Sequence, residues 1–122
     1  LLCQRIRDER AAATPRTPID VATDLVTLPY SSGTTGRPKG VMLTHLNLTA
    51  NILQASRATN MAASDVMIGV LPLFHIYGMN VLMCCNLVVQ SELVLVPKFE
   101  PEMFLQTLQD YKVTLGYLVP PI

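Results

Sequence analysis

The feature that most restricts the fold is a stretch rich in glycine and hydroxyl side chains, residues 30–40, between two apolar segments. It reads YSSGTTGRPKG. Gly33 and Gly36 permit positive φ, and Pro38 disfavours the α region for Arg37. This composition disfavours both helix and strand. We therefore expect residues 31–39 to form an irregular loop between two short strands, and not a strand-to-helix turn.

A loop of this composition is suited to binding a polyphosphate. Successive backbone N–H groups can converge on one anion, and the Lys39 ammonium group can follow a phosphate as it leaves. The stretch is not a Walker loop, because Pro38 precedes Lys39 and an apolar strand follows. It also lacks the Gly-x-Gly start of the dinucleotide fingerprint. A flexible surface loop without a ligand is the structural alternative. Further donors would be the hydroxyl groups of Ser31, Ser32, Thr34 and Thr35.

The remaining pattern alternates between short apolar segments and longer helical ones. It predicts strands over residues 25–30, 41–44, 66–71, 93–96 and 113–119. It predicts helices over residues 1–13, 45–57, 77–90 and 100–111, with residues 14–24 as an irregular approach. Thr44 is the expected cap of the second helix, whose apolar positions are Leu46, Ala50 and Leu53. Pro101 suits the first turn of the last helix, which has a stripe of Phe104, Leu108 and Tyr111. The alternation predicts a layered α/β fold with largely parallel strands.

The charges divide the chain into two parts. Residues 1–24 hold eight of the eighteen charged side chains, although only 15% of the chain is charged and half is hydrophobic. We therefore expect residues 1–24 to be a charged approach segment or linker and residues 25–122 to be a partial domain, truncated at both ends.

Composition also argues against several functional classes. The net charge is zero, so nothing favours nucleic acid or an anionic membrane. No apolar run reaches the ~18 residues typical of a membrane span, and no signal-peptide pattern is present. The three cysteines lack metal-ligand spacing, and Cys84 and Cys85 lie in an apolar segment where they act as small hydrophobes. An interaction protein built on the apolar helices remains an alternative, but it does not explain the loop.

The residues from Ser31 to Val41 resemble the signature loop of the adenylate-forming superfamily, which includes acyl-CoA synthetases, 4-coumarate–CoA ligases and luciferases. A second block, residues 71–78 (LPLFHIYG), resembles the next family motif, and residues 41–47 also fit. The resemblance covers about residues 20–122. It implies part of the large N-terminal domain of such an enzyme.

The resemblance implies particular roles for residues of both blocks. The β- and γ-phosphates of ATP would be held by Ser31, Ser32, Gly33, Thr34, Thr35, Gly36 and Lys39. His75 would lie beside the acyl carboxylate and the adenylate, so Lys39 and His75 are the candidate catalytic residues. Tyr77 would line the acyl-adenylate pocket, and Lys98 would contact coenzyme A. Each of the last three residues also has a structural alternative. His75 could be a core or helix-capping histidine, Tyr77 a packing aromatic, and Lys98 a solvated charge.

The activity that the resemblance implies is ATP-dependent activation of a carboxylic acid through an acyl-adenylate, followed by thioester formation with coenzyme A. Mg²⁺ would accompany the nucleotide. We expect the chain to be part of a longer acid–thiol ligase that resembles 4-coumarate–CoA ligase. We expect that enzyme to be cytoplasmic or peroxisomal and not secreted, and the isolated fragment to be inactive. The alternatives are a luciferase-like monooxygenase and a phosphate-binding module without ligase chemistry. The sequence leaves the particular acid and the oligomeric state open.

Overall fold

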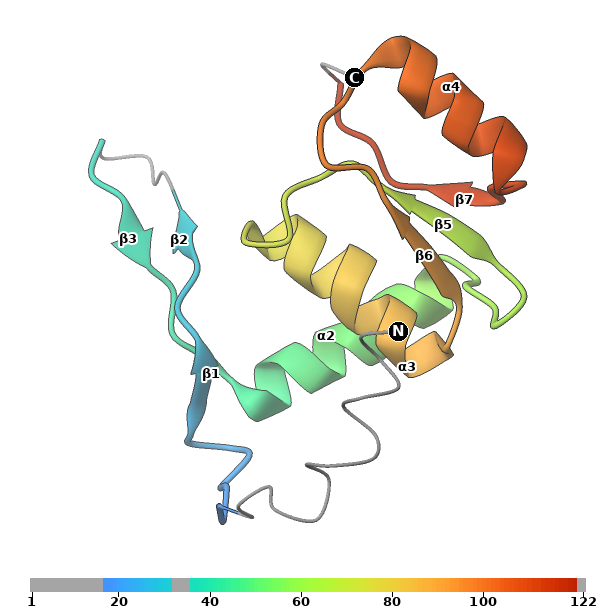
Figure 1. Ribbon diagram of the computed structural model, residues 1–122. Coiled ribbons are helices and arrows are strands. Elements are labelled where there is room, and N and C mark those ends of the chain that lie inside the picture. Colours follow the sequence, from blue (N-terminus) through green and yellow to red (C-terminus); the bar gives the residue numbers. More distant parts are fainter. Residues whose placement is uncertain (1–16, 32–35, 121–122) are drawn as a thin grey trace.

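The computed structural model describes residues 17–31 and 36–120 (Figure 1). The helix expected over residues 1–13 lies outside these ranges, as do residues 14–16 of the approach segment. Residues 17–24 are irregular, as expected, and a turn closes where the Asp24 N–H donates to the Asp20 carbonyl oxygen at 2.8 Å.

A three-stranded parallel sheet holds the core of the described chain. Its strands are β5 (Val66–Gly69), β6 (Glu92–Leu95) and β7 (Leu115–Gly116), in the order β6-β5-β7. The central strand is buried, with Met67 and Ile68 fully covered. Such a strand reads as a continuous apolar run in the sequence, because both faces of a parallel sheet are covered.

Helices cover both faces of this sheet (Figure 1). After β5 the chain forms a π-helix, η1 (Gly78–Cys85), which continues into α3 (Asn86–Val89) before β6. After β6 it forms α4 (Pro101–Asp110), which lies on the side of the sheet away from η1. Right-handed crossovers in opposite directions from β5 to β6 and from β6 to β7 require these two faces. The helices expected over residues 77–90 and 100–111 are confirmed.

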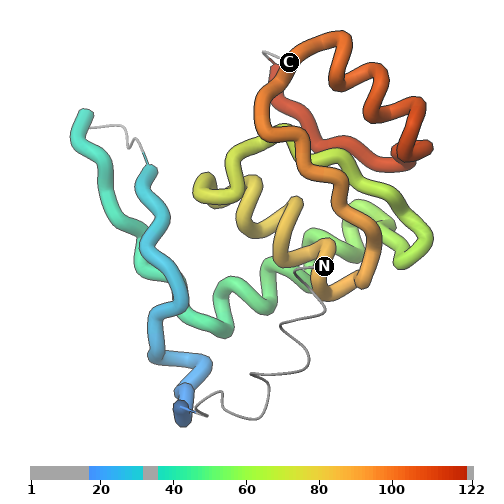
Figure 2. The backbone as a smooth tube through the Cα atoms, in the orientation of Figure 1, coloured from blue at the N-terminus to red at the C-terminus, as the bar shows by residue number. Residues whose placement is uncertain are grey.

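The helix α2 (His45–Ala58) packs on η1, so η1 lies between α2 and the sheet (Figure 2). Its predicted cap is confirmed: the Asn47 N–H donates to Thr44 Oγ1 at 3.2 Å, and Asn47 Oδ1 accepts from the Thr44 N–H at 3.1 Å. The expected apolar face is wrong, because Leu46 and Leu53 remain about half exposed. The buried residues of α2 are Ile52 and Ser56, since the face that meets η1 is set by packing.

The four strands nearest the N-terminus are antiparallel, so the prediction of largely parallel strands holds only for the three-stranded sheet. β1 (Leu25–Thr27) pairs with β4 (Leu43–Thr44), and β2 (Tyr30–Ser31) pairs with β3 (Lys39–Gly40). The chain reverses direction between β2 and β3, which puts neighbouring strands antiparallel.

Several strands are shorter than predicted. The first expected strand is divided at Leu28 and Pro29, where proline has no N–H to donate. The segment expected over 41–44 forms only β4, and the last strand is limited to β7. Strand length therefore depended on the available partners, which the apolar pattern does not specify.

Candidate functional site

The glycine-rich stretch is carried by an antiparallel hairpin. Ser31 lies opposite Lys39, and Tyr30 lies opposite Gly40, so Ser31 and Lys39 flank the base of the loop. Gly36 has φ +84°, a conformation that favours glycine. No helix follows: residues 36–38 are irregular and Lys39 begins a strand, so the expectation that no strand-to-helix turn forms here is confirmed. The expected bounds of the loop are wrong at both ends, because Ser31 and Lys39 pair as strand residues. Four of the predicted phosphate-binding residues, Ser32, Gly33, Thr34 and Thr35, lie outside the described residues.

His75 lies in a turn between β5 and η1. Its backbone N–H donates to the Pro72 carbonyl oxygen at 3.1 Å, and its own carbonyl oxygen accepts from the Met79 N–H at 2.8 Å. The ring is oriented by the backbone as well, because the Tyr77 N–H donates to His75 Nδ1 at 3.2 Å. The turn follows β5, so His75 lies beyond the carboxyl end of the central strand, where α/β proteins place ligands.

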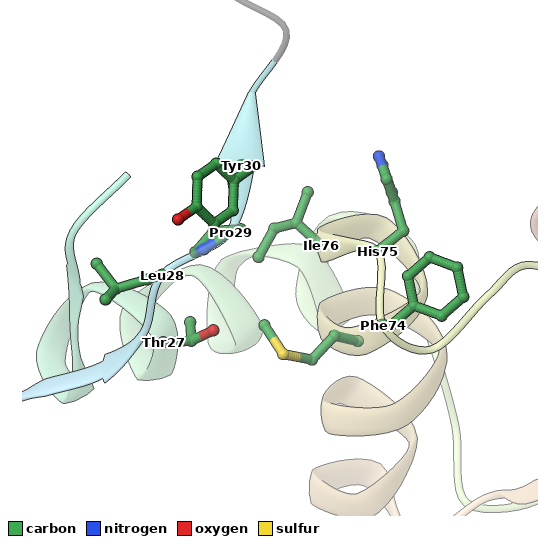
Figure 3. Close-up of a pocket in the computed structure, with 8 residues that line it drawn as sticks. Thr27, Leu28, Pro29, Tyr30, Phe74, His75 and Ile76 are labelled. Atoms are coloured by element: carbon green, nitrogen blue, oxygen red, sulfur yellow. The ribbon is translucent and has the colours of Figure 1, made fainter. Parts of the chain in front are cut away.

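The hairpin and this turn meet across a cavity of about 360 Å³ (Figure 3). One wall is the segment Thr27, Leu28, Pro29 and Tyr30, and the other is Phe74, His75, Ile76 and Met79. His75 is exposed and only its Nδ1 is engaged by the backbone among the described residues. The structure therefore brings the stem of the glycine-rich loop to the same cavity as His75. The predicted roles of these residues remain predictions.

Of the eight residues that line this cavity, only His75 was a predicted site residue, and the missed ones include two aromatic side chains, Tyr30 and Phe74. Tyr30 packs its ring toward Gly40, where an added Cβ would lie 3.9 Å from the ring. Phe74 is 91% exposed and lines a second cavity of about 320 Å³, at the carboxyl ends of β5 and β6. Tyr30 directly precedes the first motif block and Phe74 stands inside the second, so their neighbours in the sequence were the available signal.

Tyr77 and Lys98 do not line the cavity that contains His75. The Tyr77 ring makes an edge-to-face contact with Tyr117, with centroids 6.5 Å apart. Lys98 Nζ forms an exposed ion pair with Glu100 at 2.9 Å. Exposed pairs of this kind contribute roughly 0–1 kcal/mol, so the pair does not fix the lysine in place.

The described residues offer neither a reactive thiol nor a metal cluster. Burial raises the pKa of Cys84, and burial together with Cys84 raises the pKa of Cys85, so both thiols stay protonated near neutral pH. Within the same residues, no group of three His, Cys, Asp or Glu side chains is placed to hold a metal ion.

Comparison with known proteins assigns the family. The model of a family described as AMP-binding enzyme matches residues 3–122. This chain belongs to the AMP-binding enzyme family. Among its relatives, 4-coumarate–CoA ligase 1 from Petroselinum crispum is 50% identical over 103 residues, which are 81% of this chain and 19% of that protein.

Solved structures of similar proteins have the same fold in this region. Apo MatB from Rhodopseudomonas palustris gives a TM-score of 0.77 at 32% identity, covering 88% of this chain and 21% of that one. O-succinylbenzoate coenzyme A synthetase (MenE) from Bacillus subtilis, in complex with ATP and magnesium ion, gives 0.70 at 30% identity, covering 78% and 20%. The chain thus spans about a fifth of the length of these relatives.

No helix among the described residues has the length and apolar character needed to cross a membrane.

Proposed function

We propose that this chain supplies the ATP-phosphate loop and part of the acyl site of a longer acid–thiol ligase. The ligase activates a carboxylic acid with ATP through an acyl-adenylate and transfers the acyl group to coenzyme A. The observation that carries the proposal is the cavity shared by the stem of the glycine-rich loop and His75, in a chain half identical to a 4-coumarate–CoA ligase.

The residues of the hairpin are assigned to the leaving group. A substrate carboxylate oxygen attacks the α-phosphorus of ATP, and the bond to the pyrophosphate oxygen breaks. Backbone N–H groups around Gly36, the Ser31 hydroxyl and the Lys39 ammonium group, supported by residues 32–35, bind the β- and γ-phosphates. Donors fixed before the reaction stabilise the charge that develops on pyrophosphate. Mg²⁺ would accompany the nucleotide and would neutralise part of the same charge.

The residues of the turn are assigned to the acyl group. His75 lines the cavity, and among the described residues its Nε2 makes no hydrogen bond, so it can donate one to the carboxylate or the adenylate. Tyr77 follows on the same turn and contributes to the acyl pocket, and Lys98 contacts coenzyme A. Of these three residues, only His75 lines the cavity; Tyr77 and Lys98 do not.

The test is a pair of half-reactions in the full polypeptide that contains this chain. Lys39→Ala should slow pyrophosphate release from ATP and a carboxylate by roughly a hundred- to a thousandfold, about 2.7–4 kcal/mol. Thioester formation from supplied acyl-adenylate should change much less, because no pyrophosphate takes part. Arg37→Ala, which removes a charge from the same loop, is the matched control. Equal losses in both half-reactions, or none, would contradict the assignment of Lys39, and no carboxylate-dependent pyrophosphate release in the wild type would contradict the function.

A further inference from the structure

The described chain has two parts that meet mainly where α2 packs on η1 (Figures 1 and 2). The first part is the antiparallel strands and α2, and it carries the glycine-rich loop. The second is the sheet with η1, and it carries the turn that holds His75. The distance between loop and histidine therefore depends on how α2 sits on η1.

Most of this helix contact gives little directional information. The buried side chains include Ile52 on α2 and Leu82 and Cys85 on η1, and apolar burial is not directional. Ser56 Oγ donates within its own helix, to the Leu53 carbonyl oxygen at 3.3 Å. A cavity of about 370 Å³ between the helices leaves room for α2 to shift; it is lined by Leu43, Asn47, Leu48, Asn51, Ile76 and Asn80.

Two hydrogen bonds cross the interface. In the weaker one, the Cys85 thiol, a poor donor, donates to the Ile52 carbonyl oxygen at 3.7 Å. The stronger one joins two side-chain amides. Asn80 Nδ2 donates to Asn51 Oδ1 at 2.5 Å. Asn80 is only 6% exposed, and its Oδ1 has no hydrogen-bond partner within the part of the chain that the structure describes. Burying an amide with one group unsatisfied is unfavourable, and apolar side chains of similar shape would avoid the loss. Stability alone therefore does not account for two asparagines here.

We propose that the Asn51–Asn80 hydrogen bond sets the register of α2 on η1, and that both asparagines are positioning residues for adenylation. A buried asparagine fixes the register of paired helices in other systems. The claim about adenylation rests on the proposed function, whereas the claim about register does not.

The connections at both ends transmit this register to the site. α2 begins directly after β4 and is tied to it by the Thr44–Asn47 capping contacts, so a shift of α2 carries the hairpin along. η1 is tied to His75 through the hydrogen bond from the Met79 N–H. Sliding α2 by one residue is a movement of ~1.5 Å, and a misplacement of ~1 Å can reduce a rate roughly a hundredfold.

The main test variant is Asn51→Leu/Asn80→Leu in the full polypeptide. It replaces the polar pair by apolar groups of similar size, so the melting temperature should be retained. Distances are measured by electron spin resonance between labels introduced as unnatural amino acids at Met42 and Leu87, which are 68% and 70% exposed. The distance distribution should broaden, and carboxylate-dependent pyrophosphate release should fall at least tenfold.

Further variants separate register from stability. The single variant Asn51→Asp keeps an oxygen acceptor for Asn80 Nδ2, so its distance distribution should stay as narrow as that of the wild type. Gln54→Leu makes the same kind of polar-to-apolar change at another exposed position of α2, and it should leave the distance distribution and the rate of pyrophosphate release unchanged. If the double variant does not fold, Asn51→Leu at its exposed position is judged by the same two measurements. A folded variant without the hydrogen bond that keeps the narrow distribution overturns the proposal. Absence of adenylation in the wild type would contradict the proposed function and leave the distance test decisive for register.

Discussion

Thr44 connects the hairpin to α2, and Thr44→Ala should open the first turn of that helix. The Thr44 hydroxyl accepts from the Asn47 N–H at 3.2 Å and donates to Asn47 Oδ1 at 3.0 Å. The substitution removes both contacts, whereas the hydrogen bond from the backbone N–H of residue 44 to Asn47 Oδ1 can persist. Half of the capping box is lost.

The expected magnitude follows from this partial loss. Replacing a threonine cap by alanine costs about 1 kcal/mol, with a range of roughly 0.5–2. The equilibrium constant for opening of the first turn should therefore rise about fivefold. Since Thr44 is also the last residue of β4 and lies opposite Leu25, exchange in β1 should rise with it.

Hydrogen exchange with mass spectrometry on peptides that cover residues 43–50 measures this opening in the full polypeptide. Thr44→Ser keeps the hydroxyl oxygen and should preserve most of the protection. Thr49→Ala is the second control: its hydroxyl donates only to the His45 carbonyl oxygen, within the helix, at 2.7 Å. Unchanged exchange in Thr44→Ala, or an equal rise in Thr44→Ser, would refute the capping argument.

Three further predictions concern stability. Gln90 ends α3 with φ 64° and ψ 32°, so Gln90→Gly should stabilise the fold by about 0.5–1 kcal/mol in urea unfolding, and Gln90→Ala should not. Tyr117→Phe removes a buried hydroxyl without a partner among the described residues, so the free energy of unfolding should stay the same or rise. A decrease of more than about 1 kcal/mol in urea unfolding would show that the hydroxyl has a partner. Hydrogen bonds from the Ala62 N–H and the Thr114 hydroxyl lower the pKa of Asp65. The carboxylate therefore stabilises the fold above its unfolded pKa of about 3.9, and this contribution is lost as the pH falls through the lower folded pKa. Asp65→Asn should accordingly make the melting temperature less dependent on pH on the acid side. An unchanged pH dependence would contradict this.

Local chemistry allowed much of the chain to be predicted from the sequence. Pro38 and the glycines ruled out a helix at the loop, and the structure has a strand at Lys39. Thr44 was recognisable as a cap because capping depends on residues three positions apart. Pro101 marked the start of α4 for a similar reason, since proline at a first helical position lacks an N–H that would be unpaired anyway.

The candidate site was predictable in its parts but not in its assembly. The loop and His75 could be named from residue types and motif resemblance, yet their common cavity depends on Tyr30 and Phe74, which lie 44 positions apart in the printed sequence. Tyr77 shows the limit of motif spacing: it lies two residues from His75, but its ring packs on Tyr117. Sequence distance does not specify which way a side chain points at the start of a helix.

The sequence by itself therefore determined the order of the three helical segments after residue 44 and of the parallel strands between them, the absence of a helix at residues 36–40, and the helix caps, because these depend on neighbours within a few residues. Tertiary structure decided which face of α2 is buried, where each strand ends and which residues share a cavity. α2 has apolar side chains on two faces, and Ile52 is buried instead of Leu46 because η1 lies on that side. Those outcomes depend on partners distant in the chain, and a local pattern carries no information about a partner's position.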